Sequence, residues 1–246
     1  MARKHFKKLP ARTLLDSYFN PSAGQIPVLF LDSSAVIDIE RIVRMPEITK
    51  TYPHPSQSAS LILSGLEQVS GTLAFCPEIL YEIRTHHQNH RINGRREISD
   101  GVMTFINSRI HRSKQVTDVS QTFLDVDDDA HYALKQSVYD ACLVANKGKK
   151  TDIDAISFPD FRLLMHVVSL AAHSSRLARQ RVQQLGNVPG IIEGTYRLGL
   201  LSSDSHIYRT LDHFLDYDER GIRFKDYLQP FNARNMDFVD LLKHEC

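Results

Sequence analysis

Two aspartates follow short apolar runs at the points where predicted strands end. Asp32 comes directly after Val28–Leu31, and Asp204 comes after Leu198–Ser203. A short, continuous apolar run is typical of a strand that is buried on both faces of a parallel sheet. Open α/β sheets bind their ligands at the carboxyl ends of the strands, so we expect both carboxylates at one edge of the sheet. A carboxylate in such a place is costly unless something pairs with it.

Two further acids are predicted near the same edge. Residues 72–76 form another short strand, and Pro77 suits the first turn of the helix that follows and carries Glu82. Asp160 begins an apolar helix, 161–172, which leads toward the strand before the second aspartate. The pattern therefore predicts four carboxylates around one crevice.

Four carboxylates in one place have a chemical consequence. Each negative neighbour raises the pKa of the others, so the group stays ionised only if cations lie among them. Oxygen ligands without histidine or cysteine suit Mg²⁺ or Mn²⁺. Ions of this kind typically act on phosphates, where they activate water and neutralise the phosphoryl oxygens. The acids therefore predict a Mg²⁺ or Mn²⁺ site for phosphoryl chemistry.

Three features of the surrounding elements are also predicted. Ser33 or Ser34 is expected to cap the helix 35–43. The proline-containing stretch 45–58 is expected to be a loop, and 222–224 is expected to be an edge strand.

Four short windows, taken in order, resemble the PIN-domain family of metal-dependent ribonucleases. The windows are Leu-Asp-Ser-Ser-Ala-Val-Ile-Asp, Ile-Leu-Tyr-Glu-Ile, Asp-Phe-Arg-Leu-Leu-Met-His-Val-Val-Ser-Leu-Ala and Leu-Leu-Ser-Ser-Asp. The resemblance implies an α/β fold in three layers, an α/β/α sandwich around a central parallel sheet, with helical insertions. It places acids at four catalytic and metal-ligating positions, and polar side chains at two auxiliary ones. The four acids are Asp32, Glu82, Asp160 and Asp204, and the auxiliary residues are Ser34 and Ser202.

By this resemblance the chain is an endoribonuclease that hydrolyses RNA phosphodiester bonds with Mg²⁺ or Mn²⁺ and leaves a 5′-phosphate. A homodimer is an expectation from the family alone. One alternative is a non-catalytic PIN-like module that binds RNA or protein. Another is a toxin or defence nuclease that an inhibitory protein partner holds inactive. The complete set of four acids favours the enzyme, since a scaffold does not need them.

The chain is longer than compact members of that family. The separation between the third and fourth acids is 44 positions (204 − 160), which indicates inserted sequence. We predict a basic N-terminal extension and one nuclease domain with three insertions. The extension is 1–25, the domain is 26–246, and the insertions lie near 44–71, 84–112 and 174–197.

Neighbouring acids compete for two of the four positions. Asp152 and Asp154 lie close enough in the sequence to take the place of Asp160, which we prefer because an apolar helix follows it directly. Glu78 competes with Glu82 on the same predicted helix.

Basic residues gather in two of the inserted stretches. Arginines beside an acidic site would hold the phosphates that carboxylates repel, so we expect RNA contacts there. His86 and His90 are spaced to ligate a metal, but no His-Glu-x-x-His pattern accompanies them, and RNA contact or a solvated face is the preferred interpretation. The candidate RNA-binding residues are Arg84, Arg91, Arg95, Arg96, Arg176 and Arg179.

Composition bounds the remaining possibilities. The 246 residues carry a formal net charge of +1, so a nucleic-acid surface must come from local clustering. The three cysteines are far apart, which argues against a disulfide framework and for a reducing compartment. No apolar run approaches the roughly 20 residues of a membrane span, and no signal-peptide pattern is seen. We therefore expect a cytoplasmic protein with no membrane partner.

Overall fold

A computed structural model of the chain describes most of its residues. The described ranges are 8–20, 24–92, 94–125, 129–146, 156–185, 194–215 and 224–243.

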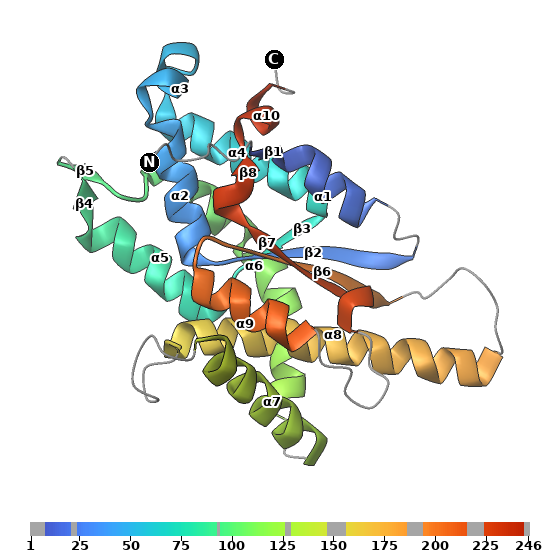
Figure 1. Cartoon of the computed structure of the whole chain (residues 1–246). Coiled ribbons are helices and arrows are strands. Elements are labelled where there is room, and N and C mark those ends of the chain that lie inside the picture. The colour runs from blue at the N-terminus through green and yellow to red at the C-terminus, as the bar shows by residue number, and fades with distance from the viewer. Residues whose placement is uncertain are drawn as a thin grey trace, which may run out of the picture.

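Four parallel strands form the central sheet, in the order β3–β2–β6–β7 (Figure 1). The middle strand β2 carries Val28–Leu31, whose four side chains are fully buried, as a strand covered on both faces requires. The prediction of a parallel α/β sheet is therefore confirmed. The strands are β2 (Gln25–Leu31), β3 (Thr72–Ala74), β6 (Thr195–Ser202) and β7 (Leu228–Asn232).

Helices cover both faces of this sheet, which makes three layers, α/β/α (Figure 1). On one face lie α1 (Ala11–Phe19), α2 (Ser33–Val43), α4 (Pro55–Ser70) and α10 (Val239–Leu242). On the other face lie α8 (Phe158–Leu185) and α9 (Ser205–Leu215), with α7 (Asp129–Ala145) packed outside them. The long helix α6 (Asp100–Leu124) lines the β3 edge and contacts both α4 and α8.

The remaining elements are short, apart from one helix that follows β3. Helix α5 (Pro77–Asn89) begins at a proline and leads into a two-stranded hairpin. Gly94 has a φ of 76° in the turn of that hairpin, a conformation that suits glycine. The other elements are α3 (Pro46–Thr51), β4 (Arg91–Ile92), β5 (Arg95–Arg96), β1 (Leu9–Pro10), β8 (Met236–Asp237), and the 3₁₀ helices η2 (Phe224–Asp226) and η3 (Ala233–Asn235).

Two expectations about these elements were wrong. The stretch 45–58 contains α3 and the first turn of α4 rather than a loop, because each helix begins at a proline that suits its first position. The edge strand is β7, at 228–232. Of the predicted strand 222–224, Phe224 begins a 3₁₀ turn that leads into β7, and 222 and 223 lie outside the described residues.

The segment that we assigned to an N-terminal extension contributes to the core. Ala11 and Leu15 of α1 are fully buried, and α1 packs against α4 and α10. Tyr18 donates a hydrogen bond of 2.8 Å to the carbonyl oxygen of Leu198 in β6. Helix α1 is thus part of the core and is tied to the sheet through Tyr18.

Candidate active site at the carboxyl end of the sheet

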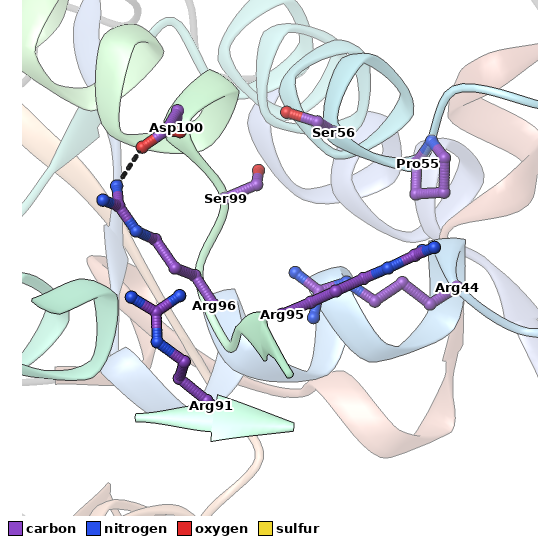
Figure 2. Close-up of a pocket in the computed structure, with 8 residues that line it drawn as sticks. All are labelled: Arg44, Pro55, Ser56, Arg91, Arg95, Arg96, Ser99 and Asp100. Carbon is purple, nitrogen blue, oxygen red and sulfur yellow. Dashed lines mark hydrogen bonds and ion pairs between the residues drawn. The ribbon is translucent and has the colours of Figure 1, made fainter. Parts of the chain in front are cut away.

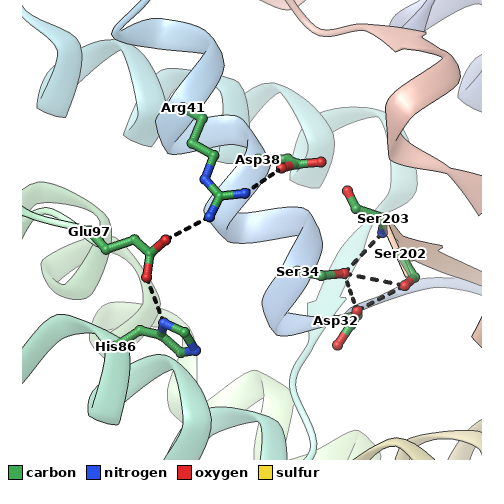
Figure 3. A network of polar contacts seen from close by, with 8 residues as sticks. All are labelled: Asp32, Ser34, Asp38, Arg41, His86, Glu97, Ser202 and Ser203. Atoms are coloured by element: carbon green, nitrogen blue, oxygen red, sulfur yellow. Dashed lines mark hydrogen bonds and ion pairs between the residues drawn. The ribbon is translucent and has the colours of Figure 1, made fainter. Parts of the chain in front are cut away.

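Asp32 lies where β2 ends and α2 begins. Its backbone is extended and its amide donates to the carbonyl oxygen of Leu201 in β6, so the residue continues the sheet pairing by one step. The side chain is 2% exposed and accepts hydrogen bonds from the hydroxyls of Ser34 and Ser202, the latter at 2.8 Å (Figure 3). The carboxylate is therefore buried and oriented by two hydroxyl donors.

The two serines after Asp32 do not cap α2, contrary to our expectation. They lie inside the first turn of the helix, and Asp32 itself occupies the N-cap position without capping through its side chain. Their hydroxyls instead reach the acids. Ser33 Oγ lies 2.9 Å from Glu82 Oε2 and 3.4 Å from Asp32 Oδ1, so it joins the two carboxylates.

Asp204 follows β6 as predicted, and its side chain shapes the start of α9. Its Oδ1 accepts the amide of His206 at 2.6 Å, and its own amide donates to Ser202 Oγ at 2.9 Å. The amide of Ser203 donates to Ser34 Oγ at 3.0 Å (Figure 3). The predicted auxiliary residues Ser34 and Ser202 thus connect the ends of β2 and β6.

The four predicted acids lie close enough to repel one another. Burial raises the pKa of Asp160 to about 7, with further contributions from the charges of Asp32, Glu82 and Asp204. Burial also raises the pKa of Asp32, and the charge of Asp204 adds to it. Burial, with the charge of Asp32, raises the pKa of Glu82, although the hydrogen bond from Ser33 and the nearby His86 lower it in part.

These carboxylates have hydrogen-bond donors but form no ion pairs in the described part of the chain. Within the described residues, none of the four forms an ion pair with an arginine, lysine or histidine. In that part of the chain no three of them bring ligand atoms within 4.8 Å of one another. The donor set is all oxygen, with Asp32 buried and the other three acids half-buried, and it matches the chemistry of Mg²⁺ or Mn²⁺.

The contacts of Glu78 distinguish it from Glu82. Glu78 accepts a hydrogen bond of 2.9 Å from Arg162 Nε, an ion pair between α5 and α8. Glu82, one turn later, faces Ser33 and the other acids. The competing candidates Asp152 and Asp154 lie outside the described residues.

A second polar cluster, which the sequence did not reveal, lies along α2 and α5. Glu97 is 6% exposed and accepts hydrogen bonds from Arg41 at 2.8 Å, while His86 Nδ1 lies 2.7 Å from its other oxygen (Figure 3). Burial raises the pKa of Glu97, but the hydrogen bonds from His86 and Arg41 outweigh it and the pKa is lowered overall. Among the described residues, His86, His90 and Glu97 have ligand atoms within 4.8 Å of one another. Because Glu97 already accepts from Arg41 and hydrogen-bonds to His86, the cluster holds the segment before α6 against α2 and α5.

The predicted RNA-binding arginines divide between two places. Arg91, Arg95 and Arg96 line one pocket at the hairpin, and Arg84 is exposed on α5. Arg176 and Arg179 are exposed on α8, 16 and 19 residues after Asp160. At 1.5 Å per residue they lie about 24 and 28 Å along the helix from that acid. The structure therefore does not bring these two arginines to the acids.

Comparison of the chain with protein-family models, with curated proteins and with solved structures found no match. In the described part of the chain, no helix has both the length and the apolar character needed to cross a membrane.

Proposed function

We propose that this chain is a metal-dependent endoribonuclease whose active site is the group of four carboxylates. One observation carries the proposal: these acids are gathered at the carboxyl end of the sheet, burial and mutual repulsion raise the pKa of three of them, and among the described residues none of the four forms an ion pair. Carboxylates held together in this way repel one another, and a bound cation would relieve that repulsion. The sequence resemblance to PIN domains supports the same activity.

Asp32, Glu82, Asp160 and Asp204 would hold Mg²⁺ or Mn²⁺. The bound metal would supply Lewis-acid assistance and neutralise charge on the phosphodiester during hydrolysis. The chain's own hydroxyls orient the ligands, because Ser34 and Ser202 donate to Asp32 and Ser33 donates to Glu82. Donors of this kind fix the direction of a ligand's lone pairs and tune its affinity for metal.

RNA as the substrate class is supported by the arginines of the hairpin that follows the acid-bearing helix α5. The hairpin that follows α5 presents Arg91, Arg95 and Arg96, and Glu82 lies near the middle of α5, nine residues before Arg91. A strand bound over both would place phosphates near cations and one phosphodiester near the carboxylates.

The test is cleavage of single-stranded and structured RNA, with DNA for comparison, in Mn²⁺, Mg²⁺ or EDTA. Glu82→Gln should lose cleavage, whereas Glu78→Gln, the same change one turn earlier on the same helix, should retain it. Asp32→Asn should also lose cleavage, with circular dichroism and melting temperature confirming the fold.

Two results would count against the proposal. Cleavage that survives in Glu82→Gln or in EDTA would remove the carboxylates from the chemistry. Absence of cleavage by the wild-type chain, together with RNA binding, would favour the non-catalytic module instead.

A further inference from the structure

A pocket of about 480 Å³ lies beyond the far end of α2 from the acids, and arginines dominate its lining (Figure 2). Arg44 comes from the end of α2, Arg91 from β4, and Arg95 and Arg96 from β5. Asp100 is the acid in the lining. Residues far apart in the sequence thus converge on one basic cavity.

The charges of this pocket do not cancel. Arg44 is paired with the fully buried Glu40 at 2.7 Å, and Arg96 is paired with Asp100. Arg91 and Arg95 have no ion-pair partner among the described residues, and both are exposed. The surplus of about two positive charges matches one phosphomonoester dianion or two phosphodiester groups.

Neutral donors complete the pocket. Ser56 lies in the first turn of α4, and Ser99 is the N-cap of α6, so two helix amino ends add partial positive charge. Ser56 Oγ accepts the amide of Gly101 at 3.2 Å, and Ser99 Oγ accepts the amide of Val102 at 3.4 Å. Each hydroxyl keeps its own hydrogen to donate.

We propose that this arginine pocket binds phosphate groups of the RNA strand whose scissile bond lies at the carboxylates. The inference rests on the proposed function and adds a second anchoring point to it. Asp32 and Arg44 flank α2, 12 residues apart, which is about 18 Å along the helix axis. At 3.4 Å per nucleotide in a stacked strand, that separation corresponds to about five nucleotides.

The first readout is RNA binding in EDTA, which does not depend on cleavage. We would measure fluorescence anisotropy of a labelled 12-nucleotide single-stranded RNA against wild type and against Arg91→Ala/Arg95→Ala. Both side chains are exposed, so the variant should fold. The matched control is Arg112→Ala/Arg234→Ala, which removes the same charge from exposed positions outside the pocket.

The pocket variant should bind at least about tenfold more weakly, since it loses charge-assisted hydrogen bonds. The slope of log K against log salt should fall by about 1.4, which is about 0.7 for each of two lost phosphate contacts. The RNA affinity of the control should stay within about twofold of wild type, because salt screens the attraction between RNA and exposed charges that do not contact it. Equal loss in the variant and the control would overturn the proposal.

The second readout is cleavage in Mn²⁺ of RNAs of 4 and 12 nucleotides. The pocket variant should lose kcat/KM on the longer RNA and not on the shorter one, which cannot span both sites. If the variant binds RNA more weakly in EDTA but neither the wild type nor the variant cleaves RNA, the phosphate pocket would be supported and the proposed nuclease activity would be refuted. Displacement of the RNA by inorganic phosphate as effectively as by unlabelled RNA would refute a strand-binding pocket and indicate a site for the free ion.

Discussion

Replacement of Asp160 by asparagine should stabilise the metal-free protein at alkaline pH. The carboxyl lies in the first turn of α8, where burial and three neighbouring acids raise its pKa from 3.8 to about 7. A group whose pKa is higher in the folded state favours folding while it is protonated. That contribution is fully present below pH 3.8, and it is lost as pH rises through about 7. Asparagine has the same shape and never takes the charge.

The shift of about three pKa units sets the size of the effect. At about 1.4 kcal/mol per unit, the penalty above pH 7 is at most about 4 kcal/mol. The positive end of α8 favours a carboxylate by about 0.3 to 1 kcal/mol, and local relaxation reduces the penalty further. We therefore expect the variant to be more stable than wild type by about 2 kcal/mol at pH 8. In a chain of this length that is about 4 to 8 °C in Tm.

The assay is thermal and urea unfolding of both proteins in EDTA at pH 4, 5, 6 and 8. The difference between them should be small at pH 4, grow steadily between pH 4 and 7, and stay constant above that. Asp118→Asn, the same change at an exposed position of α6, should leave stability unchanged throughout. A variant that is equal to or less stable than wild type at pH 8 would refute the idea that Asp160 is held against like charges.

Three further predictions follow from individual contacts. Ser202→Ala removes the hydroxyl that donates to Asp32 at 2.8 Å, so Mn²⁺ affinity measured by calorimetry should fall by about 10- to 100-fold; unchanged affinity would show that the hydroxyl does not orient the ligand. Gly199→Ala would place a methyl group 2.8 Å from a side-chain carbon of Leu29 inside the sheet, so urea unfolding should show a loss of about 1 to 3 kcal/mol, and a neutral effect would mean that the core yields there. Glu40→Gln removes the charge from a fully buried side chain whose oxygens accept from an arginine at 2.7 Å and a backbone amide at 2.6 Å. The free energy of unfolding of this variant should fall by about 2 kcal/mol. A variant as stable as wild type would contradict the view that Glu40 holds Arg44 and the segment before α6 in place.

The sequence by itself determined where the central strands end and which acids follow them. Continuous apolar runs such as Val28–Leu31 predict buried parallel strands because both faces of the sheet must be covered. The residue after such a strand lies at the carboxyl edge wherever the rest of the chain goes, which is why Asp32 and Asp204 could be predicted to lie near each other. A proline at the first position of a helix is also a local signal, and Pro77 correctly predicted the start of α5. The prolines that begin α3 and α4 carried the same signal, but we predicted a loop there.

Only the tertiary structure decided which polar side chains meet across elements. Ser33 could cap a helix or reach another residue, and it reaches Glu82 because α5 packs beside α2. Glu97 has no local signal, since its partners Arg41 and His86 come from two other segments. Hydrophobic periodicity specifies which face of an element is buried but not the orientation of polar side chains between packed elements. Those contacts depend on long-range packing, and so the arginine pocket and the size of the pKa shift of Asp160 became visible only in the folded chain.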